Sequence, residues 1–442
     1  MKNFLDVHFF FNSTKNRTIH ELASVYEQTK ELLEALENIT HNHLNSDNIK
    51  NKSILLKPNW VKENKRAEDE ICLRTHNNFT LAALKLVLKL NPSNVVIGDA
   101  PIQRCRWDKM LSDKFIKEVG SLSYEFNIPV NIIDFRRRRF YVKQNHLVTD
   151  LIPLSDYVVF DIGKQSMLES ITEPGHTKFR VTRYNPDRMN DTHMPGIHKY
   201  CIANELFKAD LVISLPKIKT HQKTGITGAL KNLVGLNGDK DFLPHHRIGG
   251  TGRGGDCYPG NSLLRYWAEL ALDEANRRQG LKTFWYWQKL SSLLWKISFP
   301  SPEHQLEAGW YGNDTTWRMV WDLNRIIEFG KHDGTIAATK RRQVYSLCDG
   351  ITAGQGNGPL DPRPLPLGLI SFTDNSSIND LVMATLMGFD PQKIPLVRQR
   401  EVDLSNCSIT LNGSYVQLDV FKDYIEKTQP PTGWMKHFNQ AE

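Results

Sequence analysis

Basic side chains at a spacing of two residues mark the centre of this chain. Lys217, Lys219 and His221 follow Pro216, and Lys223 adds a further cation. In an extended segment, side chains two residues apart leave on the same side. Lysine ammonium groups there would bind an anion, and the imidazole, whose ordinary pKa is nearest to neutrality, would transfer a proton. The spacing therefore predicts an anion site whose candidate catalytic residues are His221, Lys217 and Lys219.

Two elements must flank these cations to position them. The apolar run Ala209–Leu215 predicts a buried strand of a parallel sheet, and Ala229–Leu236 predicts a helix. The turn Thr224–Gly228 lies between them, where glycine lets the backbone approach a ligand. The free N–H groups of a helix N-terminus attract anions. The arrangement adds candidate binding residues: Thr224, Gly225, Lys231 and Asn232.

A solvated lysine loop capped by Thr224 is the alternative interpretation of this segment. The Walker pattern G-x-x-x-x-G-K-[ST] and the dinucleotide fingerprint G-x-G-x-x-G are both absent from it. The order of strand, basic loop, glycine turn and helix favours a functional site, but it does not indicate a nucleotide.

Polar residues also follow other predicted strands. Lys57 and Asn59 follow the strand Ser53–Leu56, and Asp99 follows the strand Asn94–Gly98. Ligands of open α/β sheets bind beside the carboxyl ends of the strands. Asp99 is therefore a candidate catalytic carboxylate, with a helix cap or turn as an equally good alternative. A third strand leads into a glycine-rich loop with two candidate binding residues, Asp349 and Asn357.

The segment Gly238–Pro259 carries weak signs of a metal site. A long irregular stretch in a compact chain is more often functional than not. His245 and His246 are adjacent, so they point in different directions in most backbones, and one could be a ligand; Asp380 is a further candidate. The six cysteines are scattered and form no C-x-x-C, so the sequence holds no intrinsic iron–sulfur or zinc motif. A divalent metal stays an open alternative for the unknown cofactor.

The composition suits a soluble globular protein of more than one domain. The 442 residues predict an α/β domain over 1–205 and a second over 206–442, with a helical insertion at about 280–330. The net charge of +7 favours an anionic small molecule as partner and is not a nucleic-acid signature. No signal peptide and no apolar run long enough to span a membrane are expected, so the predicted location is the cytoplasm.

An aromatic segment at residues 281–299 stands apart from the rest. Lysines recur there every seven residues among tryptophans and leucines, which is typical of a helix lying in a membrane interface. The alternative is a helix packed on the protein itself or on a second subunit. Peripheral membrane contact and a homo-oligomer are therefore both open.

Several motifs together carry a family resemblance. The most specific is ISLPKIKTHQKTGITGALKNLVG at Ile213–Gly235; KPN at Lys57–Asn59 and GDAP at Gly98–Pro101 precede it. DGITAGQGNGP at Asp349–Pro359 and DLVMATLMGFDPQKIP at Asp380–Pro395 follow it. Over about residues 55 to 395, the chain resembles the "domain of unknown function 362" family of uncharacterised prokaryotic proteins.

The resemblance implies a cytoplasmic α/β protein, which we expect to be Rossmann-like without a dinucleotide fingerprint. Some members carry a cysteine-rich ferredoxin-like module, and nothing of that kind is present here. The aromatic segment between residues 281 and 321 looks like an insertion. The resemblance points to these residues: Lys57, Asn59, Asp99, Lys217, Lys219, His221, Lys231, Asn232, Asp349, Asn357 and Asp380.

These patterns favour an enzyme that binds a carboxylate or phosphate compound in a cleft of lysine, histidine and aspartate side chains. Its chemistry would be isomerase- or racemase-like, or a group transfer, with His221 as acid–base and a desolvated lysine as base or nucleophile. One alternative is a redox or metal-linked protein related to the ferredoxin-bearing family members. Another is a non-catalytic protein that binds a membrane surface.

Overall fold

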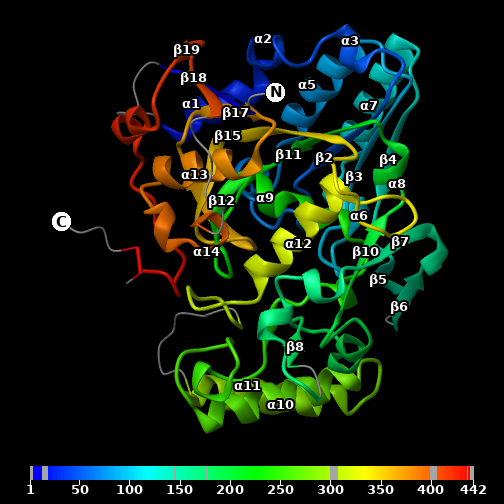
Figure 1. Ribbon diagram of the computed structural model, residues 1–442, viewed down its shortest axis with the longest axis vertical. Helices are drawn as coiled ribbons and strands as arrows, with labels where there is room; N and C mark the ends of the chain where they lie inside the picture. Colours follow the sequence, from blue (N-terminus) through cyan, green and yellow to red (C-terminus); the bar gives the residue numbers. More distant parts are fainter. Residues whose placement is uncertain are drawn as a thin grey trace.

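A twelve-stranded sheet runs through the molecule, with helices on both faces (Figure 1). The computed structural model describes residues 3–11, 18–143, 146–175, 178–298, 307–398, 406–435 and 437–438. The main path of the sheet has the order β19-β18-β1-β17-β15-β11-β2-β3-β4. Its strands are β1 (Asn3–Phe9), β2 (Ser53–Pro58), β3 (Asn94–Asp99), β4 (Val130–Asp134), β11 (Leu211–Leu215), β15 (Gln343–Asn357), β17 (Leu369–Thr373), β18 (Cys407–Leu411) and β19 (Ser414–Tyr415).

The central strands of this sheet are parallel. β15, β11, β2, β3 and β4 pair in parallel, while β17 pairs antiparallel with both β15 and β1. The predicted α/β class with a largely parallel sheet is confirmed. Strands from before and after residue 205 pair directly in this one sheet, as β2 does with β11.

Alternation along the buried strands creates a separate core on each face. Leu55 and Val212 pack in one core, whereas Ile54 and Ile213, each one residue away, pack in the other. The helices α12 (Thr316–Phe329) and α13 (Ser376–Leu386) contribute to the first core. The helices of the second core are α1 (Ile19–Glu27), α2 (Thr29–Thr40), α5 (Asn77–Leu88) and α7 (Asp113–Phe126).

The basic segment predicted as a loop is itself a strand. β12 (Lys217–His221) pairs antiparallel with β13 (Gly225–Thr227) and parallel with the far end of β15, which pairs in turn with β16 (Asp361–Leu365). The glycine-rich stretch after residue 351 also continues β15 instead of forming a loop. Its glycines give strands room to pack: a Cβ at Gly354 would lie 2.7 Å from the Cβ of Lys219.

Shorter elements complete the described chain. They form small sheets with strands β5 (Arg138–Lys143), β6 (His146–Leu151), β7 (Tyr157–Asp161), β8 (Phe179–Arg180), β9 (His193–Met194), β10 (Ile197–Ala203) and β14 (His246–Arg247). The short helices are α3 (Ser46–Ile49), α4 (Asp69–Cys72), α6 (Trp107–Met110), α8 (Glu205–Lys208), α9 (Ala229–Asn232) and α14 (Pro395–Arg398).

A helical hairpin forms one end of the molecule. α10 (Leu263–Arg277) and α11 (Phe284–Ser298) lie side by side at the bottom of Figure 1, away from the sheet. α12, which follows them, is instead buried in the core through residues such as Val320 and Leu323. Among the described residues, none of the helices combines the length and apolar character that crossing a membrane requires.

Candidate functional site

A pocket of about 380 Å³ opens where β2, β3 and β11 end. Two exposed arginines, Arg104 and Arg183, line it together with His221 and His245. Among the described lining residues, Asp99 alone is acidic. The pocket is therefore strongly electropositive. Its lysines come from five different places in the chain: Lys57, Lys219, Lys223, Lys231 and Lys240.

Lys57 and Asp99 form a buried ion pair in the pocket wall. Lys57 Nζ lies 2.8 Å from Asp99 Oδ1 and also donates to the Pro58 carbonyl at 2.7 Å. Asp99 Oδ2 accepts the Trp60 N–H at 2.6 Å. A Cβ at Gly235 would lie 1.8 Å from Asp99 Oδ1, so only glycine fits beside this carboxylate. Asp99 is engaged on both oxygens, which suits a positioning role better than proton transfer.

Two asparagines join this pair to the next lysine. Asn59 Nδ2 donates to Asn232 Oδ1 at 3.0 Å, and Asn232 Nδ2 donates to the Lys57 carbonyl at 3.0 Å. Lys219 Nζ donates to Asn59 Oδ1 at 2.7 Å and to the Leu73 carbonyl. Neutral partners satisfy the hydrogen bonds of Lys219 without neutralising its charge.

Burial, and then crowding among the lysines, lowers their pKa values. Burial, and then the charge of Lys217, lowers the pKa of Lys219 to about 7. Burial, and then Lys240 and Lys57, lowers the pKa of Lys231 to about 7. Burial likewise lowers the pKa of Lys240 to about 8. Lys231 makes no hydrogen bond or ion pair with any residue that the structure describes, so its ammonium group is available to a ligand.

The two pocket histidines present opposite hydrogen-bonding groups. His221 Nδ1 accepts the Lys223 N–H at 3.0 Å, which leaves the proton of a neutral ring on Nε2. His245 Nδ1 lies 2.6 Å from the Leu243 carbonyl and donates to it, which leaves Nε2 as an acceptor. Burial, together with the nearby lysines, lowers both pKa values well below the ordinary range. A neutral donor and a neutral acceptor therefore line one pocket.

Lys217 and Asp349, both predicted site residues, lie outside the pocket lining. Lys217 Nζ is 2.9 Å from Asp349 Oδ2 and 2.9 Å from the hydroxyl of Tyr26, which donates to Asp349 Oδ1 at 2.6 Å. Both charged side chains are fully buried. The trio joins α1, β12 and β15 as a closed structural contact.

The helix N-terminus predicted to bind the anion is occupied by Asp380. Its carboxylate accepts the N–H groups of Ala229 at 2.6 Å and Leu230 at 3.0 Å, at the start of α9. A Cβ at Gly228 would lie 2.1 Å from it. Asp380, which the sequence grouped with two histidines as a metal ligand, thus caps α9, and the group of potential metal ligands found among the described residues contains His246 but not Asp380.

Thr224, Gly225 and Asn357 are not among the lining residues either. Thr224 is buried, and its hydroxyl donates to the Ile226 carbonyl at 3.0 Å. Gly225 has a φ of +81° and packs against Trp434. Asn357 Oδ1 accepts the Thr432 N–H at 3.0 Å. These three residues shape the turn and its packing against the C-terminal segment.

Sequence reasoning missed part of the pocket. Lys240, Arg104 and Arg183 have no regular spacing to the central motif, and only the fold brings them to it. Lys240 does lie in the irregular segment that the sequence singled out for His245. Its position in that segment is the signal in the sequence that could have identified Lys240.

Two arginines of the run at residues 136–139, Arg136 and Arg139, line a second depression of about 490 Å³ beside β4. Both are already paired with Asp134, Arg136 at 2.7 Å and Arg139 at 3.4 Å. The β5–β6 hairpin begins within this run, at Arg138. The described lining of this depression contains no lysine. The first pocket, of about 380 Å³, is lined by five lysines including the unpaired Lys231, and we call it the lysine pocket.

His246, the neighbour of His245, lies in a different cluster. Its ring meets Cys257, Glu269 and Glu307, and one ligand atom from each residue lies within 4.8 Å of all the others. The sequence predicted His246 as a candidate metal ligand. It did not predict the other three residues, because no regular spacing in the chain connects them to His246.

Comparisons with known proteins place the chain in a family. The chain is 24% identical over 239 residues to the "Thylakoid-associated protein sll1697" of Synechocystis sp., a match that covers 54% of this chain and 49% of that protein. The chain thus spans about half the length of this curated relative. A crystal structure of a Thermotoga maritima protein covers 79% of this chain and 56% of that chain, with 8% identity and a TM-score of 0.31. The family model "Domain of unknown function (DUF362)" matches residues 164–385, which is half of the 442 residues and includes the β12–α9 segment and Asp380. The chain belongs to the DUF362 family.

Proposed function

We propose that the lysine pocket binds a small molecule carrying a phosphate or carboxylate group. The observation that carries this proposal is the convergence of five lysines on one pocket whose lining includes a single carboxylate. Burial, and then repulsion between the lysines, disfavours the charged forms, and the pKa values of Lys219 and Lys231, lowered to about 7, express that cost. An anion between the lysines would relieve it, and the unpaired Lys231 is the first contact we assign.

The same pocket suits acid–base chemistry on the bound anion. Lys219 and Lys231, with pKa values of about 7, exist partly as neutral amines near neutral pH and can accept a proton. His221 offers an N–H and His245 offers a lone pair. A general base beside a general acid supports an isomerase- or racemase-like proton transfer more directly than it supports group transfer.

Anion binding by a Lys231→Met variant tests the proposal. Sulfate, citrate and sugar phosphates are titrated into wild type and variant by calorimetry at pH 6. We expect the variant to bind the preferred anion about 10- to 100-fold more weakly, since a hydrogen bond to a charged group contributes about 1.5–3 kcal/mol. Lys117→Met, which removes an exposed lysine of α7, is the matched control and should bind like wild type. Equal affinities in all three proteins would contradict the proposal.

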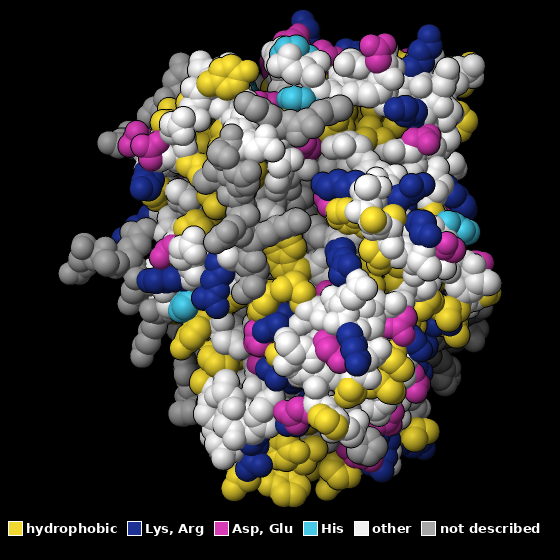
Figure 2. Space-filling view, viewed as in Figure 1, with side chains coloured by type: hydrophobic (Ala, Val, Ile, Leu, Met, Phe, Trp, Pro, Cys, Tyr) yellow, Lys and Arg dark blue, Asp and Glu magenta, His cyan; other side chains and the backbone are white. Residues whose placement is uncertain are grey.

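A second role is favoured by the exposed face of the α10–α11 hairpin. Trp267, Trp285 and Tyr286 are 59–65% exposed. Lys282, Lys289 and Lys296 are exposed on the same hairpin and form no ion pair with any described residue. Figure 2 shows apolar side chains gathered at the end of the molecule where Figure 1 places these helices. We call the following residues the aromatic patch: Leu263, Trp267, Trp285, Tyr286, Leu293 and Ile297.

We further propose that the aromatic patch contacts an anionic membrane surface. Aromatic rings beside unpaired lysines match the interface between acyl chains and negative headgroups. The thylakoid-associated relative supports the same direction by its name. Co-sedimentation with vesicles of phosphatidylglycerol tests this: we expect pelleting at low salt, less at high salt, and none with phosphatidylcholine. A protein that stays in the supernatant and forms a dimer through the patch would contradict it.

A further inference from the structure

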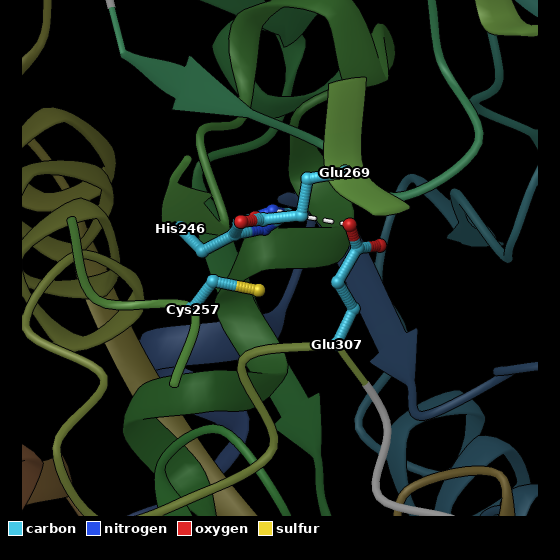
Figure 3. A group of neighbouring side chains, drawn as sticks. All are labelled: His246, Cys257, Glu269 and Glu307. Carbon is cyan, nitrogen blue, oxygen red and sulfur yellow. Dashed lines mark ion pairs between the residues drawn. The ribbon is translucent and has the colours of Figure 1, made fainter. Parts of the chain in front are cut away.

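A cluster of four side chains lies behind the lysine pocket. His246 comes from β14, Glu269 from α10, Cys257 from the loop between them and Glu307 from the segment before α12. Their ligand atoms all lie within 4.8 Å of one another. Figure 3 shows the four side chains converging on one centre. His246, Cys257 and Glu269 are each at most 3% exposed, so this is no surface cluster of acids.

Several polar atoms of this cluster lack hydrogen-bond partners among the described residues. Both ring nitrogens of His246 are buried without a hydrogen bond, as are Glu269 Oε1 and Glu307 Oε2. The remaining contact of the ring, from His246 Nε2 to Glu307 Oε1, is 3.6 Å, which is too long for a hydrogen bond. Buried polar groups in folded proteins are almost always satisfied. His246, Glu269 and Glu307 thus each hold a buried polar atom without a partner, and one ligand atom from each of them lies within 4.8 Å of the others, which indicates that a ligand belongs there.

Another buried histidine shows the usual outcome. In His193, Nδ1 lies 3.2 Å from His198 Nδ1, and Nε2 lies 3.1 Å from the Phe242 carbonyl. His193 is as buried as His246, yet each of its nitrogens has a partner. The fold therefore satisfies a buried imidazole where no ligand is needed, and the contrast singles out His246.

We propose that His246, Cys257, Glu269 and Glu307 bind one zinc ion. Imidazole, thiolate and carboxylate are the donors that zinc takes in proteins, whereas a thiolate disfavours magnesium and calcium. Tetrahedral donors at ordinary zinc–ligand lengths lie roughly 3.3–3.8 Å apart. The 3.6 Å between His246 Nε2 and Glu307 Oε1 already fits this spacing. The other donor pairs lie within 4.8 Å of one another, so the widest of them would close in by about 1 Å on binding.

The ion would tie together segments that also build the pocket. Lys223 Nζ donates to the Glu307 carbonyl, and His245 precedes His246 in the chain. On adjacent residues of an extended segment the side chains point to opposite sides. One side carries the pocket acceptor His245 and the other carries the metal ligand. Four protein ligands fill a tetrahedral shell, so the site is structural and supports the pocket wall from behind.

Metal analysis of the full chain tests the proposal. The purified protein is stripped with chelator, dialysed against zinc, freed of excess and measured by mass spectrometry of the elements. We expect about one zinc ion per chain. The ratio should fall well below that in Cys257→Ser and in Glu269→Gln, which keep the shape of the side chains. Cys407→Ser, at a half-buried cysteine of β18, and Glu274→Gln, elsewhere on α10, are matched controls and should keep the ion.

Cobalt gives an independent readout of the ligands. Cobalt in place of zinc should show the near-ultraviolet charge-transfer band of a thiolate–metal bond, lost in Cys257→Ser and kept in Cys407→Ser. A zinc ratio near zero for folded wild type, or a full ratio and an unchanged cobalt band in Cys257→Ser, would overturn the proposal. Circular dichroism establishes that each measured protein is folded, and the wild-type ratio decides the question even where a variant fails to fold. None of these readouts depends on what the pocket binds.

Discussion

The lysine pocket and the α10–α11 hairpin invert the ordinary distribution of polarity. In the pocket wall, Lys57 and Lys219 are completely buried. On the hairpin, Trp285 is 65% exposed while Lys289 is in solvent beside it. Folding alone favours neither arrangement, because buried charge and exposed aromatic surface both cost free energy.

The difference between the two regions indicates which kind of partner each of them would bind. Buried lysines that outnumber the nearby carboxylates favour the binding of an anion. Exposed aromatic rings beside exposed lysines favour binding to a surface that is both apolar and negatively charged. Apart from Lys231, the lysines of the pocket donate to asparagine oxygens or backbone carbonyls, so most of this region is preorganised. The hairpin instead presents the exposed side chains of the aromatic patch. One region suits a small ligand, and the other suits an extended partner.

The largest expected effect on the free energy of unfolding comes from substituting a buried lysine that forms an ion pair. Lys217→Met leaves the fully buried Asp349 without its cation, and removing one member of a buried pair costs about 3–5 kcal/mol. We expect the free energy of unfolding in urea, followed by tryptophan fluorescence, to fall by about that amount. Lys289→Met on the hairpin should change it by less than about 0.5 kcal/mol.

This pair of variants tests whether a buried, ion-paired lysine beside the pocket contributes more to stability than an exposed lysine of the hairpin. The double variant Lys217→Met/Asp349→Asn removes the stranded charge and should recover part of the lost stability. If Lys217→Met cost less than about 1 kcal/mol, Lys217 and Asp349 would not form the closed structural contact that we describe.

The next effect is a pH dependence confined to the pocket. Below pH 7, Lys219 and Lys231 are already charged in the free protein, so an anion binds without taking up protons. Above pH 7 they lose their protons unless a bound anion raises their pKa values. Affinity for sulfate, whose charge is constant here, should therefore fall as pH rises from 7, by up to about tenfold per unit for each lysine.

Calorimetry in two buffers of different ionisation heat measures the protons directly. We expect net proton uptake on sulfate binding at pH 8 and none at pH 5.5. Uptake at pH 8 should be smaller in Lys231→Met than in wild type. Affinity that rises between pH 6 and pH 8 would rule out these lysines as the ligands. Binding to vesicles through the hairpin does not involve Lys219 or Lys231, so it should show no such change in this range.

The sequence predicted the pocket best where a residue follows a parallel strand. Lys57 and Asp99 lie beside each other because β2 and β3 are neighbours, and ends of parallel strands share one edge of the sheet. The even spacing of Lys217 and Lys219 was misleading. The register of β12 on β15 is irregular between them, since Lys217 pairs with Asp349 and Lys219 pairs with Gly354. Local spacing carries no information about such long-range pairing.

The remaining failures have the same physical origin. The glycines after residue 351 suggested a loop, yet they lie in a strand, where a Cβ at Gly354 would be 2.7 Å from the Cβ of Lys219. The predicted anion site at α9 is filled by Asp380, which lies far away in the chain. The zinc ligands follow no fixed spacing, so only the fold could bring Cys257 to His246. In each case, tertiary contacts decided what the local pattern left open.

The smallest expected effect on stability is at the aromatic patch. Trp285→Ala removes a side chain that is 65% exposed, so the free energy of unfolding should change by less than about 0.5 kcal/mol. Trp317→Ala in α12 removes one that is 4% exposed and should cost about 3–5 kcal/mol. Urea unfolding of both variants measures the difference.

For vesicle binding, Trp285→Ala should have the larger effect and Trp317→Ala the smaller one. Trp285→Ala loses ring area at the membrane interface, so its pelleting with phosphatidylglycerol vesicles should fall, while the stability of the protein is kept. Trp317→Ala, measured at a temperature where it is folded, should pellet like wild type because its ring lies in the core. A Trp285→Ala protein that is strongly destabilised would show that this ring packs on the protein itself. The hairpin would then have ordinary polarity, and the comparison with the lysine pocket would no longer hold.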